Sequence, residues 1–464
     1  MELIHWLVMK ISRLIWNDVL VYFCLLAGIY FSFRTRFVQI RLFPKMCKLI
    51  CGRGGSGAGI SPFQSFVTTV GARVGMGNIA GVAVAVYYGG PGAVFWMWII
   101  ALFGASLAFA ESTLAQKYRR MENGQYYGGP ACYMESGLKK RFAAVLYALS
   151  VIIGPGMLMT GPQVQSVSDA FSYSFGISPV VTGLICMTVV GIVIFGGIQR
   201  ISRVAEVLTP VMCAAYLGMS FLVIGKNIEN LPEAILMIVQ SAFGLQPVFA
   251  GILGSTIVMG VKRGIYSNEA GQGNGAMIAA AAECAHPVEQ GLIQAASVYI
   301  STMLICTTSA LVILCSGFYN VAGCDGQMLV ANVPNLEYGI TWVQEALRQN
   351  LGGWAVVLLT MIVVLFVFTS LMSYYYMAEA NVKFMLPGKN AAVYVMRLAF
   401  MICIFFGALF SGDMVWNMGD IGAGLMVWIN LGALIFLGNQ VAEMLREYEK
   451  GDLQINITDK LFVK

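Results

Sequence analysis

The sequence predicts an all-α membrane protein whose chain crosses the bilayer about eleven times. Its 464 residues are 58% hydrophobic and only 11% charged, whereas soluble domains carry about 25% charged residues. A chain so poor in charge cannot cover a water-facing surface, so we expect lipid to surround most of it. Apolar runs of spanning length, about 20 residues, recur along the chain. They lie near 15–33, 61–88, 92–116, 142–170, 179–198, 204–225, 246–263, 287–317, 352–378, 391–410 and 416–444.

Composition argues against several other classes of protein. The net charge of +5 is small, and the basic residues lie between apolar runs, so nucleic-acid binding is not indicated. The eleven cysteines are scattered through apolar segments and are typical of small buried residues. His5 and His286 are the only histidines, so we expect no histidine metal site. The first run, 15–33, lacks a small-residue cleavage site and is expected to stay as a span.

The charges of the connections predict the orientation of the chain. Most of the 28 lysine and arginine residues fall in one set of alternate connections, such as 34–60 and 117–141, and in the C-terminal tail. Lys262 and Arg263 are assigned to the same set. Because cytoplasmic loops are enriched in Lys and Arg, we expect the N-terminus outside and the C-terminus in the cytoplasm of a cell whose inner membrane the protein spans.

Two local signals mark further helices. Ser61-Pro62-Phe63-Gln64 combines a capping serine, a proline at the first helical position and a glutamine three residues after the cap. It predicts the start of the second span. The longest external connection, 318–350, contains a short predicted helix from Asn335 to Gln349, which is expected to lie over the outer mouth.

The spacing of two glycine-interrupted spans predicts an inverted repeat. The second and seventh runs both contain glycines, and they lie five spans apart. Five is odd, so units that start at these runs would have opposite orientations, as in inverted-repeat transporters. The predicted divisions are an extra helix with a basic loop at 1–60, a first five-helix unit at 61–226, a second unit at 246–445 and a tail at 446–464.

The second span carries the most informative motif. Gly71, Gly75 and Gly77 lie in the middle of the run, and each costs a helix roughly 1 kcal/mol relative to alanine. Broken backbone at mid-membrane depth is tolerated where it faces protein or a watery cavity. A break there would offer free N–H groups to a carboxylate and free carbonyls to a cation. Close helix packing is the alternative explanation of the glycines; Asn78, a polar amide at depth, favours a binding site.

Polar residues in other spans are further candidates. In the ninth run, the hydroxyls of Thr369 and Ser370 suit Na⁺, since hard cations prefer oxygen ligands. The alternative is that each hydroxyl bonds to its own helix. Gln163 is a candidate donor to a substrate or, alternatively, a contact between helices. Arg73 lies within the second span and needs a cavity or a carboxylate. Glu111 and Glu269 are its candidate partners, and both are expected near the cytoplasmic face.

Several motifs together resemble the alanine or glycine:cation symporter family of bacteria and archaea. The similarity covers about residues 15 to 445. The motifs are Val74-Gly75-Met76-Gly77-Asn78-Ile79-Ala80-Gly81-Val82, Gly90-Pro91-Gly92-Ala93-Val94-Phe95-Trp96-Met97-Trp98, Phe109-Ala110-Glu111, Gly128-Gly129-Pro130, Ser267-Asn268-Glu269-Ala270-Gly271, Ala279-Ala280-Ala281-Ala282 and His286-Pro287.

The resemblance implies a leucine-transporter-like fold and a set of site residues. Ten core helices would form two inverted halves, here preceded by one extra helix. The amides of Gly75, Met76 and Gly77 would receive the substrate carboxylate, with Asn78 and Gln163 close by. Carbonyls near Gly254 and Ser255 would face the ammonium group. Thr369 and Ser370, with carbonyls of Gly71 and Val74, would hold the main cation.

Three positions depart from the family pattern. Met76 stands where threonine is usual, which makes the pocket more apolar. Ser301 stands where an aspartate is usual in the eighth span, at a candidate second cation site, so affinity or the choice between Na⁺ and H⁺ would change. Tyr374 stands where tryptophan is common and would reshape the wall around the substrate side chain.

The predicted function is therefore symport of a small neutral amino acid, alanine or glycine, with Na⁺ by alternating access. Coupling to H⁺ and an altered substrate specificity are the alternatives. A membrane enzyme would need a set of catalytic groups within the spans, a channel a continuous polar stripe, and a sensor a longer cytoplasmic domain. The expected partners are the amino acid and membrane lipid, with no nucleic acid, and the sequence predicts no particular oligomeric state.

Overall fold

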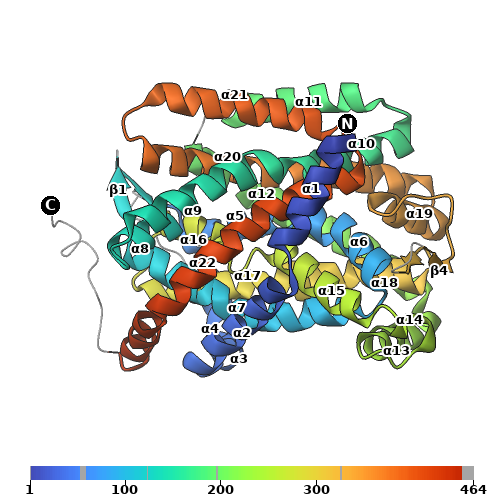
Figure 1. The fold of residues 1–464 in the computed structure, drawn as a ribbon, viewed down its shortest axis with the longest axis horizontal. Helices are drawn as coiled ribbons and strands as arrows, with labels where there is room; N and C mark the ends of the chain where they lie inside the picture. Colours follow the sequence, from blue (N-terminus) through green and yellow to red (C-terminus); the bar gives the residue numbers. More distant parts are fainter. Residues whose placement is uncertain (1, 53–58, 123, 195–196, 324–326, 452–464) are drawn as a thin grey trace.

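The computed structural model describes residues 2–52, 59–122, 124–194, 197–323 and 327–451. Most of them are helical, as the sequence predicts, and most of the long helices run roughly along the long axis of the molecule (Figure 1). The two ends of this axis therefore correspond to the two sides of a membrane. The part of the predicted tail beyond residue 451 lies outside the described residues, as does Arg53 of the basic loop.

The first half of the chain forms twelve helices and one hairpin. The helices are α1 (Glu2–Ile15), α2 (Asp18–Arg34), α3 (Val38–Arg41), α4 (Phe43–Ile50), α5 (Pro62–Arg73), α6 (Ala80–Gly89), α7 (Ala93–Lys117), α8 (Pro130–Ser136), α9 (Arg141–Ile153), α10 (Thr160–Phe175), α11 (Pro179–Val193) and α12 (Gly197–Lys226). A π-helical turn, Gly154–Leu158, joins α9 to α10. The antiparallel strands β1 (Arg120–Glu122) and β2 (Gln125–Tyr127) form a hairpin.

The second half forms ten helices and a second hairpin. The helices are α13 (Leu231–Ala242), α14 (Pro247–Ala250), α15 (Leu253–Asn268), α16 (Asn274–Ala280), α17 (Pro287–Val298), α18 (Thr307–Cys315), α19 (Ile340–Leu351), α20 (Gly353–Met385), α21 (Asn390–Gly407) and α22 (Gly412–Glu449). A π-helical segment, Tyr299–Cys306, joins α17 to α18. The strands β3 (Asn320–Ala322) and β4 (Met328–Ala331) pair antiparallel.

Within the described residues, nine helical stretches are long and apolar enough to cross a membrane, and α6 and α11 are shorter apolar helices. The chain is thus a multi-pass helical membrane protein. The predicted count of eleven crossings stays a prediction. One of the nine stretches, Ile228–Ala250, falls largely in a segment that the sequence assigns to a connection.

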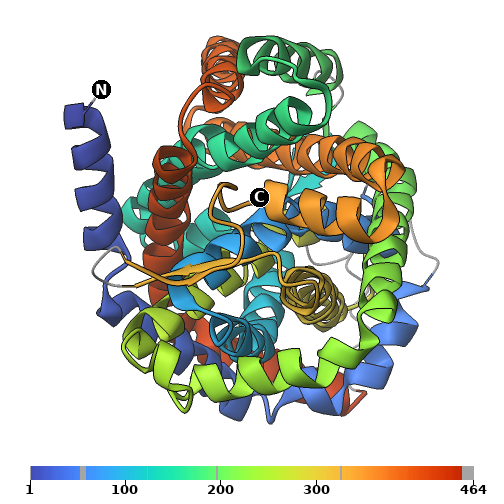
Figure 2. The ribbon, with the colours of Figure 1, turned by 90° about the vertical axis from the view of Figure 1, so that its right-hand side faces the viewer.

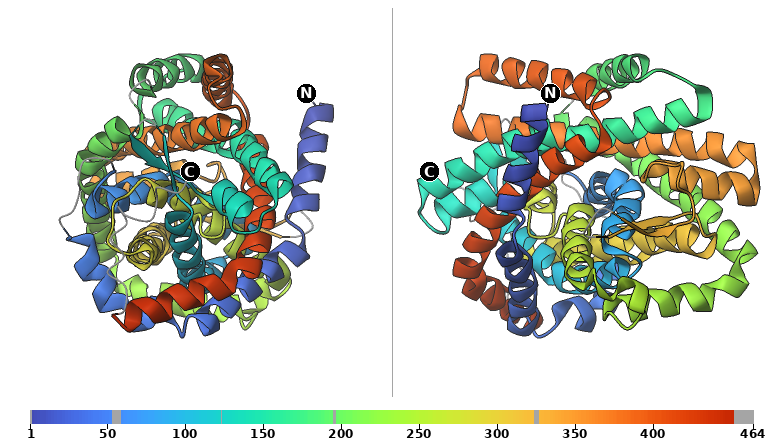
Figure 3. Two further views of the ribbon diagram at one scale, coloured as in Figure 1. Left: turned by 90° about the vertical axis from the view of Figure 1, so that its left-hand side faces the viewer. Right: turned by 45° about the vertical axis from the view of Figure 1, so that its right-hand side comes forward.

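Local signals at helix ends are confirmed. The Ser61 hydroxyl accepts from the Gln64 amide, and the Gln64 side chain accepts from the Ser61 amide, so the predicted capping box begins α5. The predicted short helix of the long outer connection is α19, which begins at Ile340 and not at Asn335. With the β3–β4 hairpin it lies across the end of the molecule seen in Figure 2. The β1–β2 hairpin and α8 lie at the opposite end (Figure 3, left).

The predicted limits of the seventh span are wrong. The chain is helical without interruption from Leu253 to Asn268, and the predicted seventh run 246–263 is interrupted before it, at residues 251–252 between α14 and α15. Lys262 and Arg263 lie within this helix and not in a cytoplasmic connection. Both contact the carboxylate of Asp420 on α22, Lys262 at 2.6 Å. Two basic side chains that the charge pattern assigned to a water-facing connection are thus paired with a buried carboxylate.

Packing places α7 at the centre of the bundle, where it contacts α2, α15, α16 and α17. The pair α11 and α21 stands as a separate layer on one side of the bundle, visible in both Figure 1 and Figure 3. The α5–α6 segment and the α15–α16 segment run in opposite directions along the long axis (Figure 1). Opposite directions at these two positions are what an inverted repeat requires.

Candidate functional site

The second span is broken at the predicted place. Helix α5 ends at Arg73, a single 3₁₀ turn covers Met76–Asn78, and α6 begins at Ala80. The predicted interval was 71–78, so the break starts about three residues later. Every residue from 74 to 79 is buried. The segment therefore faces protein and not lipid, which is the condition under which membrane proteins tolerate irregular backbone.

The amides of the break face two polar side chains. The Gly75 amide donates to Asn78 Oδ1 at 3.2 Å, and the Met76 amide donates to Gln163 Oε1 at 3.0 Å. These are two of the three amides expected to receive a carboxylate. A β-carbon at Gly75 would lie 2.7 Å from Ser370 Oγ and 2.8 Å from Gln163 Oε1. Glycine is thus required by the close approach of α10 and α20, which brings Gln163 and Ser370 to one point.

Asn78 connects the break to two other helices. Its Nδ2 donates to Ser267 Oγ and to the Ser301 carbonyl, both at 2.8 Å. With the bond from Gly75 to its Oδ1, the side chain uses both donors and its acceptor. Ser301, the candidate second cation site, lies in the π-helical segment, and its own hydroxyl donates to the Val298 carbonyl at 3.1 Å.

Hydroxyls and carbonyls meet at the end of α5, where the main cation was expected. Thr369 Oγ1 lies 3.0 Å from the Gly71 carbonyl, and Ser370 Oγ lies 3.2 Å from the Ala72 carbonyl. Thr369 also bonds to its own helix at the Phe366 carbonyl, 2.9 Å away. The bond of Thr369 to its own helix is therefore confirmed, and its role as a cation ligand stays a prediction. Uncharged oxygens in a dry pocket are the ligand type that hard cations prefer.

Tyr374 extends the site along α20. Its buried ring lies between Gln163 and Glu269, and its hydroxyl interacts with both side chains. Met76 is fully buried at the break. Gly77 lies against Tyr266, whose ring carbon is 3.0 Å from where a β-carbon would be. The wall around the break is therefore aromatic and apolar.

Gly254 and Ser255 are not brought to this site. Both lie in the first two turns of α15, and Ser255 Oγ donates to the Tyr88 carbonyl at the far end of α6. Their carbonyls are engaged in the regular helical pattern.

Sequence reasoning missed a second break, between α15 and α16. Residues 269–273 are not helical, and three of them have left-handed backbone: Glu269 (φ +54°), Gly271 (φ +82°) and Gly273 (φ +91°). The signal for this break is in the run Asn268-Glu269-Ala270-Gly271-Gln272-Gly273. Two glycines separated by a single residue favour the end of a helix. The predicted seventh span ends at residue 263, so this run lies outside it.

Buried polar groups hold this second break. Glu111 Oε2 accepts from the Gly271 amide at 3.2 Å and from Asn430 Nδ2 at 3.0 Å. The Tyr147 hydroxyl donates to the Gln272 carbonyl at 2.7 Å. Glu111 and Glu269 are completely buried inside the bundle. Both carboxylates thus lie inside the protein at the second break, and their expected position near the cytoplasmic face stays a prediction.

Arg73 ends α5 inside the same region. It is buried, donates Nη1 to the Gln294 carbonyl at 3.0 Å, and contacts the Ser297 hydroxyl. Its two electrostatic partners are Glu269 and Glu111, which confirms both candidates.

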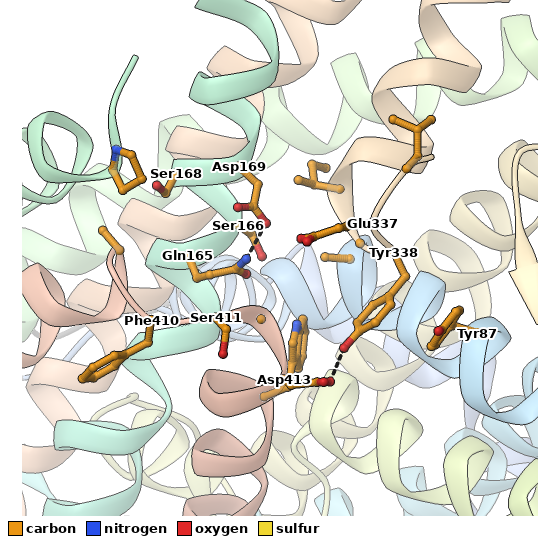
Figure 4. Close-up of a pocket in the computed structure, with 18 of the residues that line it drawn as sticks. Tyr87, Gln165, Ser166, Ser168, Asp169, Glu337, Tyr338, Phe410, Ser411 and Asp413 are labelled. Carbon is orange, nitrogen blue, oxygen red and sulfur yellow. Dashed lines mark hydrogen bonds between the residues drawn. The ribbon is translucent and has the colours of Figure 1, made fainter. Parts of the chain in front are cut away.

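A cavity of about 670 Å³ opens at the end of the molecule that carries α19 (Figure 4). Its wall includes the carboxylates of Asp169, Glu337 and Asp413, together with Ala80 of α6. Tyr88 donates to Asp413 at 2.8 Å, and Tyr338 donates to the same carboxylate. The cavity thus has residues of both α19 and the second half of the broken helix in its lining.

Comparison with known proteins gives a consistent match. A family model described as the sodium:alanine symporter family matches residues 1–460. The putative sodium/proton-dependent alanine carrier protein YrbD of Bacillus subtilis (strain 168) is 42% identical over 96% of this chain and 92% of its own. The probable sodium/glutamine symporter GlnT of the same organism is 40% identical over 95% of this chain and 89% of its own.

A solved structure shares the fold. The crystal structure of MhsT in complex with L-phenylalanine superposes with a TM-score of 0.55 at 14% identity, over 85% of this chain and 99% of that one. The leucine-transporter-like fold expected from the sequence is therefore confirmed.

Proposed function

Because the chain belongs to the sodium:alanine symporter family, we propose that it imports a small neutral amino acid, alanine or glycine, together with Na⁺. The family is one of transporters and not of enzymes. Import is placed in the cell membrane, with the N-terminus outside and the C-terminus in the cytoplasm, as the loop charges predict. The two five-helix units at 61–226 and 246–445 are the proposed inverted halves.

One observation carries this proposal, namely the two kinds of main-chain group at the broken α5–α6 helix. Main-chain carbonyls at the end of α5 face two side-chain hydroxyls. Main-chain N–H groups in the break face the side chains of an asparagine and a glutamine. Thr369 and Ser370 lie within hydrogen-bond distance of the Gly71 and Ala72 carbonyls. We propose that Na⁺ binds among these oxygens and the Val74 carbonyl. The ion would replace the hydroxyl hydrogen bonds and tie α5 to α20.

The substrate carboxylate is proposed to bind at the amides of Gly75, Met76 and Gly77. In the structure Gln163 and Asn78 accept from the first two of these amides. A buried amide left without a partner costs about 1–3 kcal/mol, so the side chains satisfy the amides until the substrate arrives. The same two side chains would then turn their NH₂ groups toward the carboxylate.

The shape of the wall favours a short side chain. Met76 and Tyr374 are both fully buried beside the break, and we propose that they enclose the substrate side chain. Gly254 and Ser255 are left out of the proposed site, because their carbonyls belong to the continuous helix α15. The ammonium group would instead face the second break, at 269–273.

Uptake into liposomes tests the function directly. The purified protein is reconstituted, and labelled alanine is supplied with an inward Na⁺ gradient or with choline in place of Na⁺. We expect accumulation only with the gradient; equal uptake under both conditions would contradict Na⁺ coupling. Competition by unlabelled glycine, alanine and glutamine then identifies the substrate, and strong competition by glutamine alone would indicate a glutamine specificity like the one that the name of GlnT states.

A further inference from the structure

Three charged side chains meet at the second break, and their charges do not balance. Arg73, Glu111 and Glu269 are each no more than 2% exposed, and the guanidinium interacts with both carboxylates. Two carboxylates against one guanidinium leave one negative charge in excess. An uncompensated charge in a dry interior is strongly unfavourable, so this cluster of three side chains needs one more positive charge.

Hydrogen bonding shows which carboxylate lacks a partner. Glu111 Oε2 accepts from the Gly271 amide and from Asn430 Nδ2, so two donors favour the ionised form of this group, and only its Oε1 has no partner among the described residues. Neither oxygen of Glu269 accepts a well-aligned hydrogen bond from the described residues. The negative charge in excess therefore belongs to Glu269.

A neighbouring acceptor lacks a donor. Asn274, the first residue of α16, is fully buried, and its side chain faces Glu269. Its Oδ1 has no donor among the described residues. A carboxylic acid at Glu269 would remove the excess charge and, with the Asn274 amide group turned over, could donate its O–H to this oxygen, so one proton satisfies both requirements.

We propose that Glu269 is a proton-binding site of the transport cycle, which takes up one proton from the outside and releases it to the cytoplasm. This inference rests on the proposed symport function and adds a second coupling ion to it. The step is a protonation of the carboxylate and its reversal, with no other bond made or broken.

Tyr374 provides the connection between this site and the substrate. Its hydroxyl interacts with Glu269 on one side and with Gln163 on the other, and Gln163 accepts from the Met76 amide. A change of charge at Glu269 is therefore transmitted to the proposed carboxylate site through a single side chain. This is the contact needed for proton binding and amino-acid binding to influence each other.

The remaining groups around Glu269 are mostly neutral. The charged neighbours are Arg73 from α5 and Glu111 from α7; the other titratable neighbours are tyrosines. These are Tyr147 of α9, Tyr266 of α15 and Tyr374 of α20. Tyrosines are neutral near pH 7, so Glu269 is the group in this cluster whose charge the other members leave unbalanced.

The test is Glu269→Gln, which keeps the shape of the side chain and removes the proton site. Na⁺-driven alanine uptake is measured from pH 5.5 to 8.5, together with proton entry followed by a pH-sensitive dye inside the liposomes. In the unchanged protein we expect alanine and Na⁺ to bring protons in. In Glu269→Gln we expect loss of at least 80% of the proton entry and a flat pH profile of the remaining uptake.

Glu345→Gln is the matched control. Glu345 lies on α19, where a hydrogen bond from Arg348 lowers the pKa of its carboxyl to about 2, so it stays ionised throughout the assay and its loss should leave the pH profile unchanged. Proton entry that persists in Glu269→Gln overturns the proposal. So does an unaltered pH profile combined with fewer Na⁺ ions bound per alanine, which would make Glu269 a sodium site.

Measurements on the unchanged protein keep the proposal testable if Glu269→Gln does not fold, as judged by size-exclusion chromatography. Absence of alanine-dependent proton entry in the unchanged protein also overturns it. Na⁺-dependent uptake without proton entry would leave the proposed function standing and remove only the proton site. Absence of Na⁺-dependent uptake would contradict the proposed function itself.

Discussion

At the scale of single residues, Asn78 joins three parts of the site. Its side chain accepts from Gly75 and donates to Ser267 on α15 and to the Ser301 carbonyl in the π-helical segment. A sequence argument found this residue because a polar amide at membrane depth needs partners. Its partners could not be found in that way, because they come from segments about 190 and 220 residues further along the chain.

Asn78→Ala should abolish alanine uptake while the protein still inserts into the membrane. Substitution removes three hydrogen bonds and leaves the Gly75 amide without its acceptor, at a cost of about 1–3 kcal/mol. Uptake in liposomes and recovery of folded protein from membranes measure the two effects. Uptake at more than half the original rate would contradict the assigned role.

Thr369→Val should weaken Na⁺ binding more than alanine binding. The substitution keeps the shape and volume of the side chain but removes the hydroxyl that lies 3.0 Å from the Gly71 carbonyl. We expect the Na⁺ concentration for half-maximal uptake to rise at least tenfold. Na⁺ should also stabilise the unchanged protein against heat, since a ligand that binds the native state raises its melting temperature, and this stabilisation should be lost in the variant.

Thr360→Val is the control for that measurement. Thr360 lies on the same helix, is equally buried, and bonds to Val356 of its own helix and to α19. It lies away from the proposed ion, so the Na⁺ dependence should be unchanged. An equal rise in both variants would show that the effect comes from α20 and not from the site.

At the scale of helices and loops, the α5–α6 break was predicted closely and the α15–α16 break was not. Gly71, Gly75 and Gly77 lie within a long apolar run, so their cost to the helix was visible in the sequence. The second break follows a helix that carries Lys262 and Arg263, and these charges ended the apparent span early. Their partner, Asp420 on α22, is known only once the helices are packed.

Gly75→Ala tests the first break. The new methyl group would lie 2.7 Å from Ser370 Oγ and 2.8 Å from Gln163 Oε1, closer than the atoms allow, so both proposed binding regions must shift. We expect uptake to fall at least tenfold. Gly218→Ala is the control, because nothing lies within 4 Å of the new methyl group on α12 and alanine favours a helix by about 1 kcal/mol. Equal losses in both variants would contradict the explanation.

Asp420→Asn should strongly destabilise the protein. The residue is 2% exposed and forms ion pairs with both Lys262 and Arg263, and removal of one partner from a buried ion pair costs about 3–5 kcal/mol. A lower melting temperature in detergent measures the effect. Glu449→Gln removes a partly exposed ion pair with Arg41, which is worth about 1 kcal/mol or less, and should change the melting temperature little.

At the scale of the whole molecule, native cysteines report the orientation. Cys47 and Cys51 are exposed and lie on or directly after α4, in the basic loop predicted to be cytoplasmic. A membrane-impermeant maleimide should label them in inside-out vesicles and not in right-side-out vesicles. The double variant Cys47→Ser with Cys51→Ser identifies their share of the label. If Cys47 and Cys51 are instead labelled in right-side-out vesicles, the orientation is opposite to the predicted one.

The cavity at the α19 end of the molecule affects how Na⁺ and the amino acid reach the proposed site. Three carboxylates line it, and among the described residues of its lining there is no lysine or arginine. A negative funnel raises the local concentration of cations and speeds their encounter with the protein, and dissolved salt weakens that attraction over roughly 8–10 Å. A salt that is not transported should therefore slow uptake when Na⁺ and amino acid are scarce and leave the maximal turnover unaffected. The negative charge of the cavity thus contributes most to uptake when the surrounding medium contains little salt.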